Sequence, residues 1–274
     1  MQYDPIKKML GRVFNTTPFL RRLFYRLLDL LLLRTWHVRR ELKKWNRDHS
    51  TNGHILDAGS GFGQYSFFMA KKFRNKTIEG IDVKQEQIAD CNRFFAQSGL
   101  ANATFFYGDL TEHQKPSAYN LILSVDVMEH IEEDVKVFKN FHQSLKAHGM
   151  VLISTPSDQG GSDVHHHQKD EEDKNASFID EHVRDGYSLT EIREKLKRAG
   201  FTKIQARYQY GAPGKISWKL SMKIPILLIN ASKIFFIVLP FYYLITFPFC
   251  MILNFLDVRM NHKSGTGLIV KAWK

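Results

Sequence analysis

The sequence predicts an α/β fold with a doubly wound, largely parallel sheet. Between residues 54 and 210, short runs rich in Ile, Leu, Val and aromatic side chains alternate with runs of helical spacing. Strands that alternate with helices at this rhythm are typical of a parallel sheet covered by helices on both faces. Two apolar, basic regions flank this core, so we also expect an N-terminal helical extension and an apolar helical insertion before the last strand.

The expected strands are short, and turns or amphipathic runs separate them. A Thr-Pro pair at 17–18, an N-cap followed by proline, predicts the start of one long helix that runs to about Trp45. A capping box at 188–191 opens a helix that stops at Gly200. The strands are expected at 54–58, 77–81, 103–107, 119–125, 149–155, 201–210 and 267–273, and the core helices at 65–73, 85–97 and 134–147.

The net charge divides the chain into parts. The formal charge of +11 is concentrated at residues 1–49, with 12 Lys+Arg against 4 Asp+Glu, and at 213–262, with 5 against 1. Residues 50–212 are slightly acidic, with 19 against 23. Basic side chains interleave with long apolar ones over 18–45, which favours an anionic membrane surface over nucleic acid as partner. We expect basic amphipathic helices at 1–49, a core at 50–212, an apolar insertion at 213–262 and a final core strand at 263–274.

The number of cysteines and the first residues of the chain indicate the cellular compartment in which we expect the protein. Two cysteines, Cys91 and Cys250, give no disulfide framework, which fits a reducing cytosol. The first 20 residues contain no apolar region followed by small-residue cleavage signals, so we expect no secretory signal peptide. The expected location is cytoplasmic, peripheral or monotopic on the inner face of the membrane.

A glycine-rich loop, Leu-Asp-Ala-Gly-Ser-Gly-Phe-Gly at 56–63, follows the first expected strand. Its glycines let the backbone turn tightly and approach a ligand at the start of a helix, where amide N–H groups are free. A dinucleotide fingerprint would need glycine at position 64, where this chain has Gln64. Asp57 stands two residues before the first glycine. An acid there repels a pyrophosphate and suits a cationic amino-acid ligand.

Acidic residues also end the next two expected strands, at Asp82 and Asp109. A carboxylate 23 residues after the first loop glycine is suited to accept both hydroxyls of a ribose. The fourth expected strand runs into Ser-Val-Asp-Val-Met-Glu-His at 124–130. In this order, the features resemble the class I S-adenosylmethionine-dependent methyltransferases. The likeness is greatest to the branch that methylates small molecules and lipids, including the ubiquinone-type O-methyltransferases.

The resemblance covers residues 50–212 and 266–273, and it implies a seven-stranded sheet whose last two strands form an antiparallel hairpin. It also implies S-adenosyl-L-methionine as the cofactor. Asp57 and the loop glycines would then meet the methionine part and Asp82 the ribose. The implied cofactor residues are Asp57, Gly59, Gly61, Gly63, Asp82, Val83, Asp109 and Leu110 (both at the adenine), and Ser124 and Asp126 on the methyl side.

Catalysis requires alignment more than activation, because a sulfonium methyl is already reactive; an oxygen nucleophile also needs a base. Glu129 and His130 follow the fourth strand at the edge where α/β ligands bind, so they are candidates for a base. Alternatively, His130 caps the next helix and Glu129 orients cofactor groups. His182 is a further catalytic candidate and Tyr187 a substrate candidate, with lid packing as the alternative. The three histidines at 165–167 diverge, so we assign no metal site.

An uncharged stretch of 20 residues, from Ile234 to Leu253, has the length of a membrane-spanning helix. It lies between two strands that are expected to pair, so both ends of the insertion must return to the same side of a membrane. We therefore expect a shallow re-entrant hairpin that turns near Pro240 or Pro248, or helices in the membrane plane. The alternative is an insertion that packs on the N-terminal helix or forms a dimer face.

These features predict a membrane-associated methyltransferase. Its acceptor is expected to be a hydrophobic or lipid-linked small molecule, with O-methylation as the first choice, and no nucleic-acid partner is expected. One rival is an RNA methyltransferase, which the acidic core disfavours. The other is a non-catalytic membrane-bound module that binds S-adenosylmethionine, which the intact loop and Asp82 disfavour.

Overall fold

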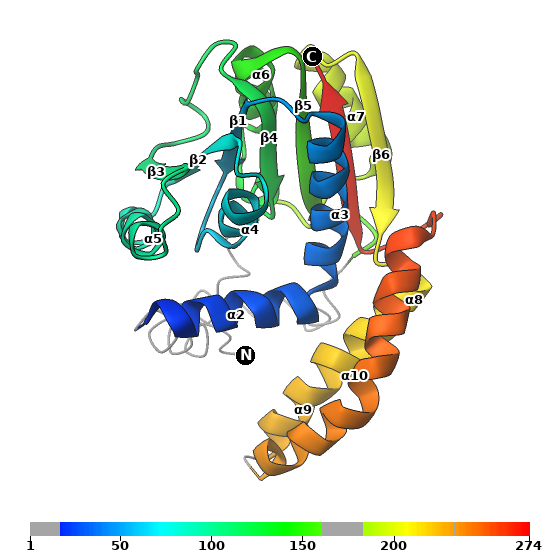
Figure 1. The fold of residues 1–274 in the computed structure, drawn as a ribbon. Coiled ribbons are helices and arrows are strands. Elements are labelled where there is room, and N and C mark those ends of the chain that lie inside the picture. The colour runs from blue at the N-terminus through cyan, green and yellow to red at the C-terminus, as the bar shows by residue number, and fades with distance from the viewer. Residues whose placement is uncertain (1–16, 161–182, 233) are drawn as a thin grey trace, which may run out of the picture.

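A seven-stranded sheet forms the centre of the molecule in a computed structural model that describes residues 17–160, 183–232 and 234–274 (Figure 1). The strand order is β3-β2-β1-β4-β5-β7-β6, and β7 alone is antiparallel to its neighbours. The predicted α/β class and the antiparallel last pair are confirmed. The strands are β1 (Gly53–Ala58), β2 (Lys76–Asp82), β3 (Ala103–Tyr107), β4 (Tyr119–Val125), β5 (Leu145–Pro156), β6 (Lys203–Gln209) and β7 (Gly267–Trp273).

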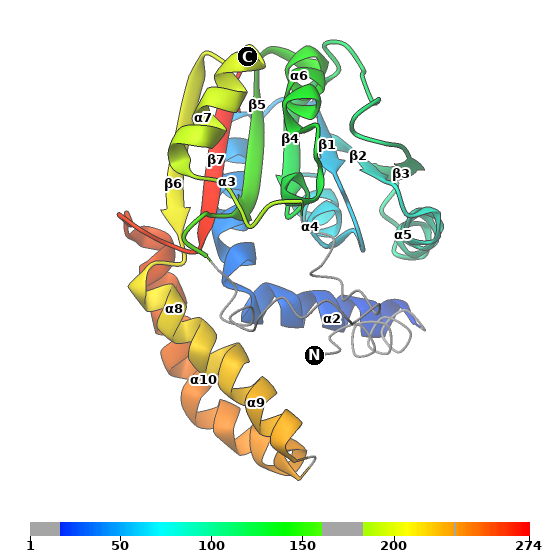
Figure 2. The same ribbon diagram turned by 180° about the vertical axis from the view of Figure 1, so that it is seen from behind.

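Helices cover both faces of the sheet, because each carries one apolar side. One face packs against α3, α4 and α5, which bury Leu42, Phe68 and Phe94; the other packs against α6 and α7 (Figures 1 and 2). The helix predicted at 134–147 ends at Ser144, since Leu145 already pairs with Tyr119 in the sheet. The core helices are α4 (Gln64–Lys72), α5 (Gln85–Gln97), α6 (Asp134–Ser144) and α7 (Leu189–Arg198).

The strands β1 to β6 all run in one direction, so their carboxyl ends meet at one edge of the sheet, called the carboxyl edge here. The glycine-rich loop follows β1 at this edge, and the apolar insertion begins there after β6. Figure 1 shows the helix α2 and the insertion on this same side of the sheet. The edge that binds ligands in α/β folds therefore faces both flanking regions.

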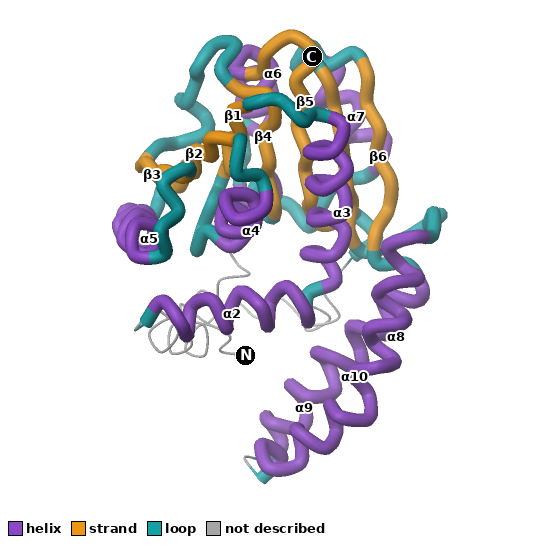
Figure 3. The backbone as a smooth tube through the Cα atoms, viewed as in Figure 1, coloured by secondary structure: helices purple, strands orange, loops and turns teal. Residues whose placement is uncertain are grey.

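Residues 18–48 fold as two helices, whereas we predicted one from Pro18 to about Trp45. α2 (Pro18–Leu31) begins at Thr17, whose hydroxyl accepts from the Leu20 N–H at 3.2 Å, as an N-cap does. Leu32 is extended, with φ −89° and ψ 109°, and α3 (Leu33–Asp48) follows in a new direction (Figure 3). The bend lets α3 pack on the sheet while α2 crosses the carboxyl edge, and this tertiary packing explains a break that no glycine or proline marks.

Residues 212–259, called the arm here, form a helical hairpin that projects from the carboxyl edge (Figure 1). The chain turns between Ala231 and Phe235, and not near Pro240 or Pro248 as we predicted. Both prolines lie inside a continuous helix, while extended Ser232 ends the first leg and its hydroxyl accepts from the Ile234 N–H at 3.3 Å. The legs are α8 (Ala212–Trp218), a π-helical segment η2 (Lys219–Lys223) and α9 (Ile224–Ala231) against α10 (Phe235–Arg259).

The fully buried Asp257 connects the arm to the core through its hydrogen bonds. Its carboxylate accepts from the Gly214 N–H at 2.9 Å and from the Tyr210 N–H at 3.2 Å, and it lies 2.8 Å from His37 Nε2. Burial opposes its charge, yet the hydrogen bond with His37 and the neighbouring donors hold the pKa of Asp257 below its ordinary value. Both legs of the arm and helix α3 therefore meet at one ionised group.

Candidate active site

The glycine-rich loop is tied to the neighbouring strand and leaves open space on its outer side. The N–H groups of Gly59 and Ser60 both donate to the Ile81 carbonyl, at 2.9 and 3.0 Å. Gly59 has φ +79°, and a Cβ there would overlap Val127, so a side chain is excluded on steric grounds. Gly61 has φ +49° and a Cβ there would meet nothing closer than 3.9 Å. The loop thus has room for a ligand to approach its backbone.

Asp82 stands against this loop at the end of β2. Its carboxylate accepts from the Gly61 N–H at 2.8 Å and from the Lys84 N–H at 3.0 Å. These two bonds fix the acid beside the open side of the loop, which is where a ribose-binding carboxylate belongs in α/β folds. Val83 follows it and is exposed. Gly63, with φ +74°, precedes α4 and completes the turn into that helix.

The predicted adenine residues lie one strand further along the edge. Asp109 is exposed and its carboxylate accepts from the Thr111 N–H at 2.8 Å. Leu110 is buried in the core cluster that includes Ile81. The Asp109 side chain is therefore available to a ligand, whereas Leu110 packs into the core below the carboxyl edge.

Asp57 lies behind the glycine-rich loop and is buried. It accepts a hydrogen bond from the Ser66 hydroxyl at 2.6 Å. Burial raises the pKa of Asp57 to about 6, against the lowering effect of the Ser66 hydrogen bond. A nearby cation would reverse this shift, because an opposite charge favours the ionised carboxylate. Asp57 is thus suited to ionise when a positively charged ligand binds beside it, and to stay protonated more readily when no cation is near.

An ion pair that the sequence did not predict lies at the residues predicted for the methyl side. Asp126, after β4, has φ +51°, a conformation that is uncommon outside glycine. Its carboxylate pairs with the guanidinium of Arg34 from α3. Tyr210, after β6, also has a positive φ, +60°, and burial raises the pKa of its phenol, although the neighbouring Arg34 lowers it. Backbone strain of this kind concentrates at functional sites.

Glu129 lies next to this ion pair in a short 3₁₀ turn, Met128–His130. Its side chain is buried, and it accepts from the Thr155 hydroxyl at 3.0 Å. Burial raises the pKa of Glu129 against the lowering effect of His130 and Arg34 nearby. The structure therefore brings Glu129, His130 and Asp126 together at the carboxyl edge, with Glu129 the group whose proton affinity is enhanced.

Tyr187 does not face the site, contrary to our substrate assignment. It is fully buried, its hydroxyl donates to the Met128 carbonyl at 2.9 Å, and it lies 2.8 Å from an Asp134 carboxylate oxygen. These bonds make it a packing residue, which corrects the prediction. His182 and the histidines at 165–167 lie outside the described residues. Within the described part of the chain, no group of three or more His, Cys, Asp or Glu side chains is arranged to hold a metal ion.

The residues at the edge fit S-adenosylmethionine. The hydroxyls of Ser60 and Ser124 are buried and have no hydrogen-bond partner among the described residues, so both are free to meet a polar ligand. Ser60 follows β1 beside Gly61, and Ser124 lies near the end of β4, where it is paired with Ala58 of β1. A cofactor with an amino-acid part, a ribose and a base would use Asp57, Asp82 and Asp109 in that order along the edge.

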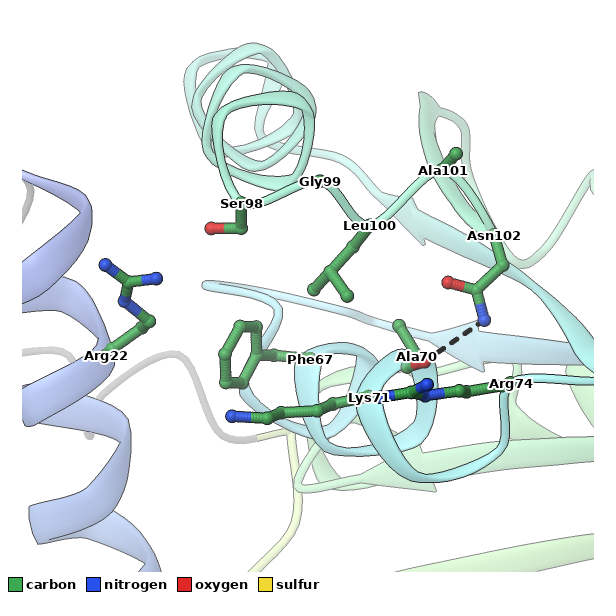
Figure 4. A pocket seen from close by; sticks show the side chains of 10 residues that line it. All are labelled: Arg22, Phe67, Ala70, Lys71, Arg74, Ser98, Gly99, Leu100, Ala101 and Asn102. Carbon is green, nitrogen blue, oxygen red and sulfur yellow. Dashed lines mark hydrogen bonds between the residues drawn. The ribbon is translucent and has the colours of Figure 1, made fainter.

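A separate cavity of about 510 Å³ lies away from these residues (Figure 4). It opens between α2, α4 and the connection from α5 to β3, and none of the predicted cofactor residues lines it. Arg22, Lys71 and Arg74 border it without an acidic side chain among its lining residues. The cavity therefore suits an anion rather than the cofactor.

The fold and the loop define a Rossmann-like domain that binds a nucleoside-containing cofactor. Comparison with known proteins is more specific, because residues 49–207 match the family described as a methyltransferase domain. That match covers more than half of the chain, so the protein belongs to the methyltransferase domain family, and S-adenosylmethionine is its cofactor.

Individual relatives agree with this family but differ in acceptor. Phosphoethanolamine N-methyltransferase 1 of Arabidopsis thaliana is 30% identical over 160 residues, which are 56% of this chain and 29% of the plant protein. The ubiquinone biosynthesis O-methyltransferase of Pseudomonas paraeruginosa is 28% identical over 37% of this chain and 43% of its own length. This chain thus spans less than half of both relatives.

A solved structure has a similar fold over most of this chain. Phosphoethanolamine N-methyltransferase 2 of Haemonchus contortus, in complex with S-adenosyl-L-methionine, superimposes with a TM-score of 0.57. The alignment covers 92% of this chain and 60% of that chain at 20% identity. At this identity the comparison establishes the shared fold.

Proposed function

We propose that this protein methylates a hydrophobic or lipid-linked small molecule at a membrane surface. An oxygen atom of that molecule is our first choice of methyl acceptor. The observation that carries the proposal is the apolar, exposed surface of the arm. In the described residues, α10 is the one helix long and apolar enough to cross a membrane, and only 6% of its most apolar window is buried. Water-exposed apolar area of this extent marks an interaction site.

The topology supports a membrane dip rather than a span. β6 precedes the arm and β7 follows it, and these strands pair along their whole length from Lys203↔Trp273 to Gln209↔Gly267. Both legs of the arm therefore start from the same edge of the sheet, and a bilayer that receives the tip lies on that side. The carboxyl edge, with the cofactor loop, faces the same way (Figure 1).

Side chains along the first leg suit a bilayer surface. Lys215, Lys219 and Lys223 recur every four residues and so share one side of the leg. Lysines so placed reach lipid phosphates with their ammonium groups while the stems follow apolar surface. Trp218 is partly exposed beside them, as aromatic residues are at membrane interfaces.

A guanidinium donor and a carboxyl group with a raised pKa support the proposal of an oxygen acceptor. The cofactor supplies an activated methyl group on a sulfonium. Arg34 pairs with Asp126, yet its guanidinium Nε–H has no hydrogen-bond partner among the described residues, and a guanidinium donor suits a phenolate or alkoxide oxygen better than a protonated amine. Glu129, with its raised pKa, accepts the proton that an oxygen nucleophile loses. Arg34 and Glu129 are therefore the residues that we assign to nucleophile activation.

The test combines product detection with one substitution. Lipid and pigment extracts from cells with and without the protein are compared by mass spectrometry for a species 14 mass units heavier. A Glu129→Gln variant should bind S-adenosylmethionine with unchanged affinity and lose about 100-fold in kcat. It should also lose the rise of kcat with pH, because the wild-type base works only when it is deprotonated. An unchanged kcat in this variant would remove Glu129 from catalysis, and methylated RNA as sole product would favour the rival function.

A further inference from the structure

The helix α2 exposes a stripe of apolar side chains and buries two polar ones on its opposite side, which a helix that only covers a core does not do. Arg21 and Tyr25 are buried, while Phe19, Leu23 and Leu27 are exposed. At 3.6 residues per turn, the exposed apolar residues fall within an arc of about 80°. These residues, called the α2 stripe here, are Phe19, Leu23, Leu27 and Leu30.

The inner side of α2 holds the cofactor loop. The Arg21 guanidinium donates to the Phe62 carbonyl at 2.8 Å and pairs with Asp90 of α5. The Tyr25 hydroxyl donates to the same Phe62 carbonyl. Phe62 stands between the second and third glycines of the loop, so its carbonyl orientation is part of the loop conformation. Two buried side chains of α2 thus determine the backbone that meets the cofactor.

The outer side of α2 suits an anionic bilayer. Arg22 and Arg26 are exposed and border the α2 stripe. Arg22 also lines the cation-bordered cavity together with Lys71 and Arg74 (Figure 4). An anionic membrane offers hydrocarbon and phosphate at one interface, and this combination matches leucines flanked by arginines. The stripe belongs to the helix that crosses the carboxyl edge, on the side from which the arm projects (Figure 1).

We propose that α2 lies in the bilayer interface and couples membrane contact to the cofactor loop, so that anionic lipid raises the affinity for S-adenosylmethionine. The inference rests on the membrane location in the proposed function. A bilayer that receives the stripe restricts the position of α2, and with it Arg21 and Tyr25. Their bonds to Phe62 then favour the loop conformation that binds the cofactor. Because coupling is reciprocal, the cofactor raises the affinity for vesicles by the same factor.

The test measures cofactor affinity with and without membranes. The full chain is dialysed to equilibrium with radiolabelled S-adenosylmethionine, alone or with vesicles containing about one third anionic phospholipid. We expect a Kd about fivefold lower with these vesicles. In flotation assays, saturating S-adenosylmethionine should raise vesicle binding by about the same factor, which a purely structural role of α2 would not produce.

Two variants separate the stripe from the loop contact. A Leu23→Asn/Leu27→Asn variant alters exposed residues only, so it should keep the Kd measured without vesicles and its arm-dependent flotation, and lose the fivefold gain. An Arg21→Lys variant keeps the charge opposite Asp90 but loses one donor to Phe62; it should float normally and show a reduced gain.

Three outcomes would overturn the inference. A wild-type protein that floats with vesicles but keeps the same Kd would refute the coupling and leave the proposed membrane location standing. A protein that does not float at all would refute the membrane location and the coupling with it. Dimers that dissociate in the Leu23→Asn/Leu27→Asn variant, with no lipid effect, would assign the α2 stripe to a second copy of the chain.

Discussion

Replacing three exposed apolar residues of the arm should detach the protein from membranes without destabilising it. Ile237, Phe241 and Leu244 are 70%, 68% and 76% exposed, and their spacing puts them on one side of α10. Full burial of such a side chain contributes about 1.5–3 kcal/mol, so three side chains of this exposure contribute about 3–6 kcal/mol on entering lipid. Asparagine at all three positions should therefore lower the vesicle partition coefficient by at least about 100-fold.

The assay is flotation on sucrose gradients with vesicles of increasing lipid concentration. Thermal unfolding without lipid should change little, because exposed positions contribute within about 0.5 kcal/mol to stability. An Ile216→Asn variant is the matched control: Ile216 is 51% exposed but lies at the base of the arm, between lysines, so its loss should weaken partitioning less than threefold. Equal partitioning of the triple variant and the wild type would refute the reasoning and point to a protein partner for the arm.

Two further predictions concern buried acids. Asp57 holds its proton up to a pKa of about 6 in the folded state against an ordinary 3.8, so the folded protein binds more protons between these values and stability falls as pH rises through them, by about 3 kcal/mol. Chemical denaturation between pH 4 and 7 should reveal this loss, and Asp57→Asn should lack it. Calorimetry in buffers of different ionisation enthalpy should register proton release on S-adenosylmethionine binding near pH 6. Asp257→Asn, at the junction of arm and core, should lower the free energy of unfolding in urea by about 3 kcal/mol, while exposed Asp48→Asn leaves it unchanged.

The parts of the fold that local sequence dictates were predicted well. Apolar runs and loop glycines placed the seven strands within a few residues, because period-2 and buried-strand patterns act locally. The Ser188 cap was also confirmed, with its hydroxyl accepting from the Glu191 N–H at 3.0 Å. These features need no knowledge of distant contacts.

The missed features depend on distant contacts. Leu32 breaks the N-terminal helix in a run of leucines, and only the packing of α3 on the sheet and of α2 on the loop favours that bend. Arg34 precedes its partner Asp126 by 92 residues, so no local pattern marks it. Tyr187 was a substrate candidate with lid packing as the alternative, and its ring lies in the core. The two prolines of the arm predicted its turn, yet both lie inside the continuous helix α10, and the turn lies at extended Ser232 instead.

The strand β7 lies between β5 and β6 in the sheet, although it follows the arm in the sequence. During synthesis, the ribosome therefore releases the apolar arm while the sheet still lacks an internal strand. Neither β5 nor β6 has its final neighbour at that stage, so unpaired strand edges and exposed apolar helices coexist in the nascent chain. Early delivery of the arm to lipid would remove the apolar half of this hazard before the sheet closes. If the proposed membrane location holds, the order of synthesis favours contact of the arm with lipid before the sheet is complete.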